Sequence, residues 1–247
     1  MHLLQEGDLI EVLEANASQE VNFLFIQKWM RSAEGRTKRF DDLMQHNGHW
    51  NTLPPMPTAR RSHSSIYHNH YLYVVGGCDD CGWDCRPLNS VDALDMRNLQ
   101  WNHLPPLPRE VDFASLAIVS DNLFVLGGCS GLNWAADVHE FDSTQQTWRQ
   151  RSPMPEICEW GVAVSFDDHV YVVGGQDRRC MRFNPRNNTW TSLQRPQFIH
   201  SYGPSLVLNG NIVVFGGLND DSIEEYSPLT DYHSAKITVA MKQKQTG

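Results

Sequence analysis

Three cysteines lie close together in the segment Cys78-Asp-Asp-Cys81-Gly-Trp-Asp-Cys85, and thiolates at this spacing can hold a soft metal ion such as Zn²⁺. The fourth ligand would be Asp84 or a histidine. A structural zinc site normally has a second ligand pair at a defined distance, and none is visible in the sequence. The neighbouring aspartates should raise the pKa of these thiols, which argues against a redox sensor. Metal binding and redox sensing are thus the two chemical alternatives to a variable surface loop, and we expect neither a metal nor a cofactor.

The sequence offers no pattern typical of an enzyme. It contains no nucleophile elbow that would place a Ser-His-Asp triad and no glycine loop that would cradle a phosphate. The eleven histidines are scattered, and several of them fall in turns. We therefore expect a noncatalytic protein with no catalytic residue.

Composition narrows the possible partners. The chain has 247 residues, 40% of them hydrophobic, and a formal net charge of −9. This charge argues against nucleic acid or an anionic membrane as the main partner, because such contacts depend on Lys and Arg. The acidic N-terminus does not resemble a secretory signal, and six unevenly placed cysteines favour free thiols in a reducing compartment. We expect a cytoplasmic location, with the nucleus as the alternative.

A tryptophan and a glycine pair recur four times, with the tryptophan always 26 residues before the first glycine. A repeat of about 40 to 50 residues is typical of propellers and solenoids. We interpret these residues as structural: each tryptophan lies between adjacent blades with its indole N–H free to reach a backbone acceptor, and the glycines lie where neighbouring backbones crowd and φ can be positive. They are Trp50, Trp101, Trp148 and Trp190, with Gly76, Gly77, Gly127, Gly128, Gly174, Gly175, Gly216 and Gly217.

Each repeat predicts four strands. A proline-rich link such as residues 55–57 cannot join a hydrogen-bonded ladder, so it connects repeats. A short strand, a turn and a continuous apolar strand follow, as in residues 64–67, 68–70 and 71–75, and continuous apolarity indicates burial on both faces. Four strands per repeat make one propeller blade, so we predict an all-β propeller of about four four-stranded blades. The expected repeats are about 59–108, 109–155, 156–196 and 197–235, within a propeller region spanning 47–235.

The two ends of the chain differ from the repeats. Up to residue 46 the apolar residues have helical spacing, as in Val21, Leu24, Phe25 and Trp29, which predicts a short helical segment over 1–46. Residues 236–247 carry no repeat and form a predicted tail.

Comparison of equivalent positions identifies candidate binding residues. Fourteen residues before each glycine pair, where the inner strand of a blade should begin, the repeats differ from one another. Three aromatics and two carboxylates there suggest a rim that binds an extended peptide with some basic character. The alternative is that these aromatics plug the channel or pack between blades. The candidate rim comprises Arg61, Ser62, His63, Asp112, Phe113, Glu159, Trp160, Ser201 and Tyr202.

The order of these marks resembles the kelch repeat over roughly residues 50 to 233. In each repeat the glycine pair is followed by a pair such as Leu94-Asp95 or Phe141-Asp142, then by the tryptophan and a Pro-x-Pro link. The helical segment resembles the last part of a BACK domain, which joins a BTB domain to a propeller in the BTB–kelch family. That resemblance implies a substrate-recognition part of an adaptor for a cullin-3 RING ubiquitin ligase. Other kelch proteins bind actin or act as cytoskeletal scaffolds, which is the alternative.

Two departures from the family pattern bear on these expectations. We expect no BTB domain, because Met1 already falls in the BACK-like segment, so cullin-3 would be reached through another, BTB-containing chain. We also expect an unusually small propeller, because His233 stands where a fifth tryptophan belongs.

Overall fold

The computed structural model describes residues 52–79, 86–131, 133–218 and 220–235, which are entirely strands, turns and loops. No helix in these ranges is long and apolar enough to cross a membrane. The helical segment predicted over 1–46, the tail at 236–247 and the residues Trp50, Cys81 and Cys85 lie outside the described residues.

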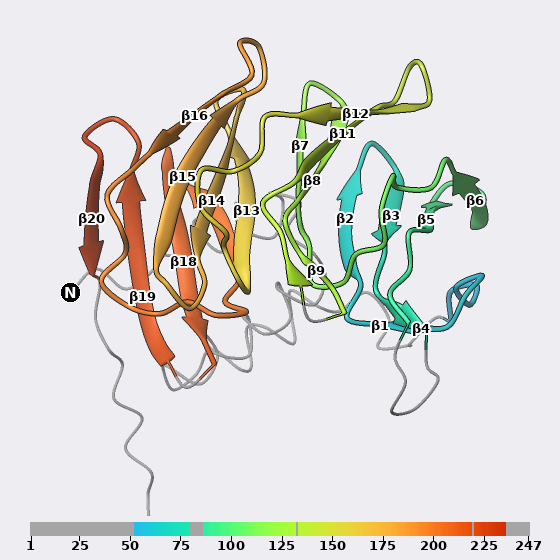
Figure 1. Ribbon diagram of the computed structural model, residues 1–247, viewed down its shortest axis with the longest axis horizontal. Helices are drawn as coiled ribbons and strands as arrows, with labels where there is room; N and C mark the ends of the chain where they lie inside the picture. Colours follow the sequence, from blue (N-terminus) through green and yellow to red (C-terminus); the bar gives the residue numbers. More distant parts are fainter. Residues whose placement is uncertain (1–51, 80–85, 132, 219, 236–247) are drawn as a thin grey trace, which may run out of the picture.

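Sixteen of the strands form four antiparallel sheets of four strands each, and these sheets are the blades (Figure 1). Blade 1 contains β2 (Ser64–His68), β3 (Tyr71–Val75), β5 (Val91–Asp95) and β6 (Gln100–Leu104); blade 2 contains β7 (Ser115–Val119), β8 (Asn122–Leu126), β11 (Val138–Asp142) and β12 (Thr147–Arg151). Blade 3 contains β13 (Gly161–Phe166), β14 (His169–Gly174), β15 (Arg179–Asn184) and β16 (Thr189–Ser192); blade 4 contains β17 (Ser205–Leu208), β18 (Asn211–Gly217), β19 (Asp220–Ser227) and β20 (Tyr232–Ala235). The all-β, four-bladed prediction is confirmed.

The four remaining strands are short pairs beside the blades. β1 (Arg60–Arg61) pairs with β4 (Cys78–Asp79), and β9 (Cys129–Ser130) pairs with β10 (Asn133–Trp134). Each pair includes the residues that directly follow a glycine pair.

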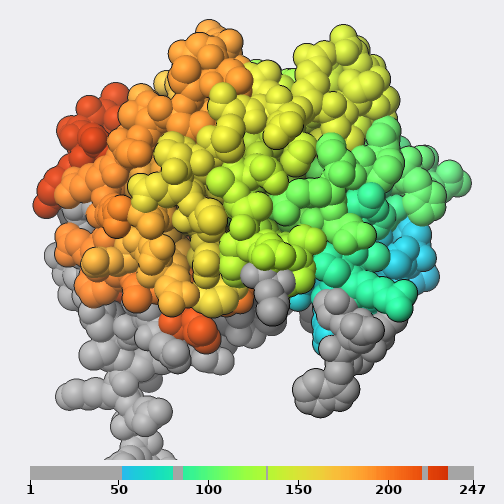
Figure 2. Space-filling model, in the orientation of Figure 1, coloured from blue at the N-terminus to red at the C-terminus, as the bar shows by residue number. Residues whose placement is uncertain are grey.

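The blades lie side by side in an arc, from β2 on the right of Figure 1 to β20 on the left. The first strand of each blade is the innermost, so β7 contacts both β2 and β13, and β13 contacts β17. In the space-filling view, consecutive blades pack against each other without a break (Figure 2).

Apolar side chains from neighbouring blades form the core between them. Val75 of blade 1 belongs to one cluster with Phe141 of blade 2. Phe124 of blade 2 packs with Phe183 of blade 3, and their ring centroids are 6.0 Å apart. Tyr171 of blade 3 belongs to one cluster with Ile212 and Tyr226 of blade 4. Face-to-face stacking of blades therefore buries the continuous apolar strands β8 and β14, as predicted.

The repeated tryptophans occupy equivalent places on the outer strands β6, β12 and β16. Each is half-buried and donates its indole N–H to a carbonyl oxygen in the preceding link: Trp101 to Pro54 at 3.1 Å, Trp148 to Pro105 at 2.7 Å and Trp190 to Ser152 at 2.9 Å. In blade 4, His233 has the register of these tryptophans, because it pairs with Tyr226 as Trp190 pairs with Phe183. These three tryptophans thus each join an outer strand to the link that precedes its blade.

The glycine pairs lie where a side chain has no room. All eight glycines have positive φ. A Cβ on Gly76 would lie 2.1 Å from the carbonyl oxygen of Val111 in the next link, and one on Gly128 would lie 2.4 Å from a methyl carbon of Val111. Both the left-handed backbone and the close approach of neighbouring chains require glycine here.

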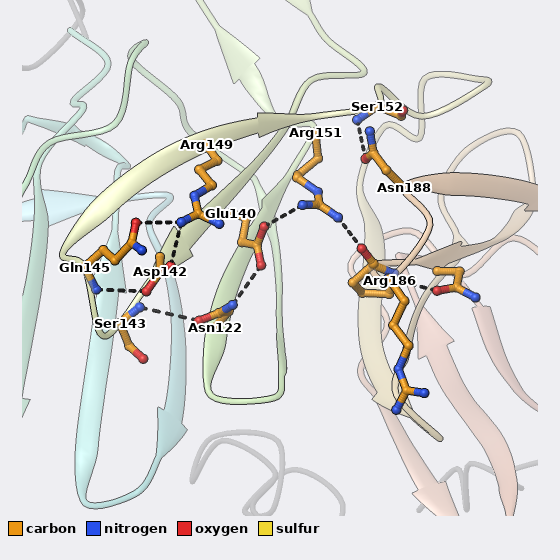
Figure 3. Close-up of polar contacts among 12 residues, drawn as sticks. Asn122, Glu140, Asp142, Ser143, Gln145, Arg149, Arg151, Ser152, Arg186 and Asn188 are labelled. Atoms are coloured by element: carbon orange, nitrogen blue, oxygen red, sulfur yellow. Dashed lines mark hydrogen bonds and ion pairs between the residues drawn. The ribbon is translucent and has the colours of Figure 1, made fainter.

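A polar network ties the outer parts of blades 2 and 3 together (Figure 3). Arg151 on β12 forms an ion pair with Glu140 at 3.1 Å and donates a hydrogen bond to the carbonyl oxygen of Pro185 in the next blade. Glu140 also accepts a hydrogen bond of 2.8 Å from Asn122. The arginine thereby joins strands of its own blade to the loop of its neighbour.

In each of the two end blades, a basic side chain and a carboxylate form a buried pair at one equivalent position. In blade 1, Arg60 contacts Asp92 at 2.5 Å, and in blade 4, His200 contacts Glu224 at 3.0 Å. All four side chains are almost completely buried. The repeat alignment places apolar or neutral residues there in the middle blades, namely Val111 with His139 and Cys158 with Met181.

Candidate functional site

The candidate rim residues lie where each link enters an inner strand, and the backbone there has an unusual conformation. At the four equivalent positions φ is 55° for Ser62, 52° for Phe113, 58° for Trp160 and 59° for Tyr202. This left-handed region is uncommon for non-glycine residues and is strained for bulky ones. All four repeats therefore have the same backbone conformation at this position.

Backbone hydrogen bonds hold these turns against one another. Phe113 N–H donates to the carbonyl of Ser62 at 3.0 Å, and Tyr202 N–H donates to the carbonyl of Trp160 at 2.9 Å. Between these two pairs, the Ser115 hydroxyl donates to the carbonyl of Gly161 at 2.9 Å. The bonds join consecutive blades, so neighbouring rim positions are fixed relative to each other.

Three predicted rim aromatics meet and are joined by a fourth aromatic, Trp134. The centroids are 6.3 Å apart for Phe113–Trp134, 5.5 Å for Trp134–Trp160, 5.4 Å for Trp160–Tyr202 and 6.0 Å for Tyr202–Phe113. The contacts therefore form a closed cycle, which we call the aromatic cluster. Because Phe113 and Tyr202 belong to the links before blades 2 and 4, the cluster spans three links of the arc.

The aromatic cluster is open to solvent. Tyr202 is 52% exposed and Phe113 is 37% exposed, while Trp134 and Trp160 are half-buried. Trp160 and Tyr202 are stacked with their planes 27° apart, whereas Trp134 stands at 89° to Trp160. Aromatic side chains packed in this way are rigid, large and accessible, which suits the centre of a binding surface.

The other predicted rim residues surround the cluster in different ways. Arg61 is exposed on β1, while Ser62, His63 and Glu159 are half-buried. Asp112 and Ser201 are buried, with 8% and 4% exposure, so neither offers a surface contact. The rim is thus an aromatic surface with its acidic and small residues beneath or beside it.

Asp112 is a buried carboxylate next to the cluster. Its backbone pairs with Cys129 through two hydrogen bonds of 2.8 Å. Burial raises the pKa of its carboxyl group above the ordinary 3.8, although its own backbone N–H and the charge of Arg109 oppose this. Burial, and then the negative charge of Asp112, also raise the pKa of the Tyr202 hydroxyl.

A shallow hollow adjoins the cluster between blades 3 and 4. Leu218 lines it and donates its N–H to the carbonyl of Ser201, the neighbour of Tyr202, at 2.8 Å. Its walls combine exposed apolar and charged side chains, so an extended chain that leaves the cluster would meet both kinds of contact. The lining includes Asp177, Arg178, Arg195, Phe198, Ile199 and Leu218.

The cysteine segment gives a different result from the one expected. Cys78 is disulfide-bonded, so its sulfur is not available as a thiolate ligand. The expectation of free thiols is therefore wrong for Cys78, whereas Cys129, Cys158 and Cys180 are free and buried. In the part of the chain that the structure describes, no three His, Cys, Asp or Glu side chains are placed to hold a metal ion.

Sequence reasoning missed Trp134, because it lies in the variable loop after the second glycine pair. One signal could have found it. In both of the first two repeats a tryptophan follows the cysteine after the glycine pair by five residues, as Trp83 follows Cys78 and Trp134 follows Cys129.

Comparisons with known proteins agree with this architecture. The family described as the KLHDC2/KLHL20/DRC7 Kelch-repeats domain matches residues 42–217. Kelch-like protein 35 of Mus musculus is 30% identical over 188 residues, which cover 75% of this chain and 32% of that protein. Kelch-like protein terF of Aspergillus terreus is 28% identical over 205 residues, covering 75% of this chain and 44% of that protein.

Two further proteins are similar to this chain. Beta-scruin of Limulus polyphemus is 31% identical over 136 residues, covering 51% of this chain and 14% of that protein. The solved structure of YjhT has a TM-score of 0.64 at 18% identity, covering 76% of this chain and 68% of its own, and this likeness concerns the fold alone. The chain spans less than half the length of the three relatives named.

Proposed function

This chain belongs to the kelch-repeat family, and we propose that its propeller is a noncatalytic module that captures a protein partner on the aromatic cluster. The observation that carries the proposal is the backbone of Phe113, Trp160 and Tyr202, three large aromatics held at positive φ. Strained conformations of this kind persist at functional sites, where the surrounding structure enforces them.

The exposure of the cluster favours binding over a structural plug. A turn that needs only a left-handed residue is served best by glycine or asparagine, so three aromatics at these positions require another reason. A plug would bury its rings, yet Tyr202 is 52% exposed. The exposed rings form a ready-made contact surface on a rigid backbone.

We further propose that the partner is a substrate for ubiquitination, presented to a cullin-3 RING ubiquitin ligase through a BTB-containing chain. The similarity to Kelch-like protein 35 supports this assignment at the level of the family. The proposed location is cytoplasmic, with the nucleus as the alternative, and imaging of the tagged full chain tests it.

The capture experiment compares three forms of the full chain in cell extracts. The double variant Trp160→Ala/Tyr202→Ala removes two stacked rings of the cluster. Tyr232→Ala is the matched control, since Tyr232 is 56% exposed on the outer strand β20 of blade 4. We expect that the wild-type chain and the control retain a set of proteins that the double variant does not retain. These proteins should also accumulate in cells when cullin ligases are inhibited. Equal retention by all three forms would contradict the proposal.

An actin-binding scaffold is the second candidate, because blade 4 exposes another apolar surface. Leu229 is 94% exposed and Tyr232 is 56% exposed beside the outer strand. Co-sedimentation with actin filaments distinguishes the two functions. Sedimentation that Leu229→Ser/Tyr232→Ser abolishes, and that the Trp160/Tyr202 variant keeps, would favour the scaffold.

A further inference from the structure

The four rings of the aromatic cluster offer π faces at close range. Tryptophan is the best neutral acceptor for a cation, and the attraction extends to about 6 Å from the ring centroid. Neighbouring centroids in the cycle are 5.4 to 6.3 Å apart. A cation placed between two neighbouring rings is within this range of both centroids.

A buried carboxylate lies directly beside these rings. Asp112 precedes Phe113 in the chain and is 8% exposed, and its Oδ1 atom has no hydrogen-bond partner among the described residues. Burying a carboxylate oxygen without a partner is costly, and a nearby positive charge reduces this cost. The negative charge of Asp112 reaches the cluster, because after burial it is the cause that raises the pKa of Tyr202.

Arg109, whose charge lowers the pKa of Asp112, makes its ion pair and hydrogen bond with other groups. Arg109 forms an ion pair with Asp137 at 3.1 Å and donates to the carbonyl of Gly127 at 3.1 Å. A second carboxylate, Glu159, precedes Trp160 in the same way that Asp112 precedes Phe113. After burial, the charges of both carboxylates contribute to raising the pKa of the Cys129 thiol, so both act on the same region beneath the cluster.

From this geometry we propose that the aromatic cluster is a cation subsite, which accepts the positively charged side chain of an arginine or lysine in the partner protein. The inference rests on the proposed function, since it names the chemistry of the captured segment. The π faces hold the cation, and the charges of Asp112 and Glu159 favour it over a neutral side chain of the same size. The net charge of −9 favours the approach of a basic segment.

The test starts from a phage-displayed library of random linear peptides, selected on the immobilised full chain. We expect selected peptides that compete with one another and share an arginine or lysine. Replacing that arginine by citrulline, or that lysine by norleucine, removes the charge and keeps the length. On the wild-type chain this replacement should weaken binding about tenfold, the range of a desolvated cation–π contact supported by carboxylates.

Protein variants assign the effect to the cluster. In Trp134→Leu and in Trp160→Leu, the difference in affinity between the charged and the neutral peptide should become smaller than on the wild-type chain, because one of the rings that hold the cation is lost. Asp112→Asn should weaken the charged peptide more than the neutral one, whereas Tyr232→Ala should change neither. The two tryptophan variants are independent, and the peptide comparison on the wild-type chain needs no variant to fold.

The outcomes separate this inference from the proposed function. Peptides that depend on the cluster but bind equally well as citrulline or norleucine forms would overturn the cation subsite and leave peptide capture standing. A selection that yields no peptide dependent on the cluster would overturn both.

Discussion

At the scale of single residues, Trp160 combines a strained backbone with a ring that contributes to the aromatic cluster. Its φ of 58° suits glycine, yet the residue is a tryptophan whose ring stacks on Tyr202. The backbone term and the ring term can be separated by substitution, because glycine relieves the strain and alanine does not.

We predict that Trp160→Gly is more stable than Trp160→Ala by about 1 kcal/mol, the reverse of the usual order of these residues. Both variants lose the ring, so both should lose partner binding. Chemical denaturation of the two variants measures the difference in the free energy of unfolding. If the alanine variant is the more stable one, the strain at this position is not real.

A second prediction concerns His139, which is buried on β11 at the position of the end-blade carboxylates. Burial lowers its pKa below the ordinary 6.5, while the charge of Asp137 opposes this and that of Arg109 adds to it. The unfolded chain therefore takes up the proton first as the pH falls, so the stability should fall below pH 6.5.

His139→Met tests this prediction, since Met181 occupies the equivalent position in blade 3. Urea denaturation between neutral pH and pH 5 should show a smaller loss of stability in this variant than in wild type. Identical pH dependence in the two chains would refute the assigned cause.

At the scale of elements, the four blades have the same strand order but differ in the side chains buried at equivalent positions. The buried pair Arg60–Asp92 in blade 1 corresponds to Cys158 and Met181 in blade 3. The two first members also make the same hydrogen bond: Arg60 donates to the carbonyl oxygen of Gly76, and Cys158 donates to that of Gly174. In blade 4, the buried Glu224 keeps a lowered pKa despite burial, which alone would raise it, because His200 and two backbone N–H groups donate to it.

Removing one member of the Arg60–Asp92 pair should therefore reduce the stability of the fold far more than removing both. Among the described residues, Arg60→Cys leaves His103, at 2.6 Å, as the only side-chain partner of the buried Asp92, and it should cost about 3 to 5 kcal/mol of stability. The double variant Arg60→Cys/Asp92→Met adopts the apolar solution of blade 3 and should recover most of that loss. Thermal and chemical unfolding of the single and double variants measure both values, and additive losses would contradict the account.

The elements were predictable from sequence because their causes are local. In each repeat, the order of a proline link, an apolar strand and a glycine pair predicts where the strands lie. The turns lie where two consecutive residues, such as Asn69 and His70, have positive φ. The aromatic cluster was predictable only in part. Trp134 lies in a loop of variable length, and the contact of Phe113 with Tyr202 depends on how three links curve together, which no local pattern encodes.

At the scale of the whole molecule, each core cluster between blades is shared by two neighbours, and the aromatic cluster joins the links before blades 2, 3 and 4. The fourth blade has a smaller cluster of its own, built from Leu206, Val213 and Phe215. Binding at the aromatic cluster therefore depends on the arc as a unit rather than on a single blade.

The adaptor proposal predicts how the whole chain behaves with cullin-3. In this proposal the propeller captures the substrate, and a BTB-containing chain makes the contact with cullin-3. The purified chain should not co-elute with cullin-3 in size-exclusion chromatography unless such a chain is added. A stable complex of this chain with cullin-3 alone would contradict the assignment of the cullin contact to another chain.

The most direct measurement of partner capture is site-specific photo-crosslinking in cells. A benzophenone amino acid replaces Tyr202 in the aromatic cluster in one form of the full chain, and Tyr232 on β20 in the other. The account predicts a discrete cross-linked protein from position 202 and none from position 232. Adducts from position 232 alone would contradict capture at the aromatic cluster.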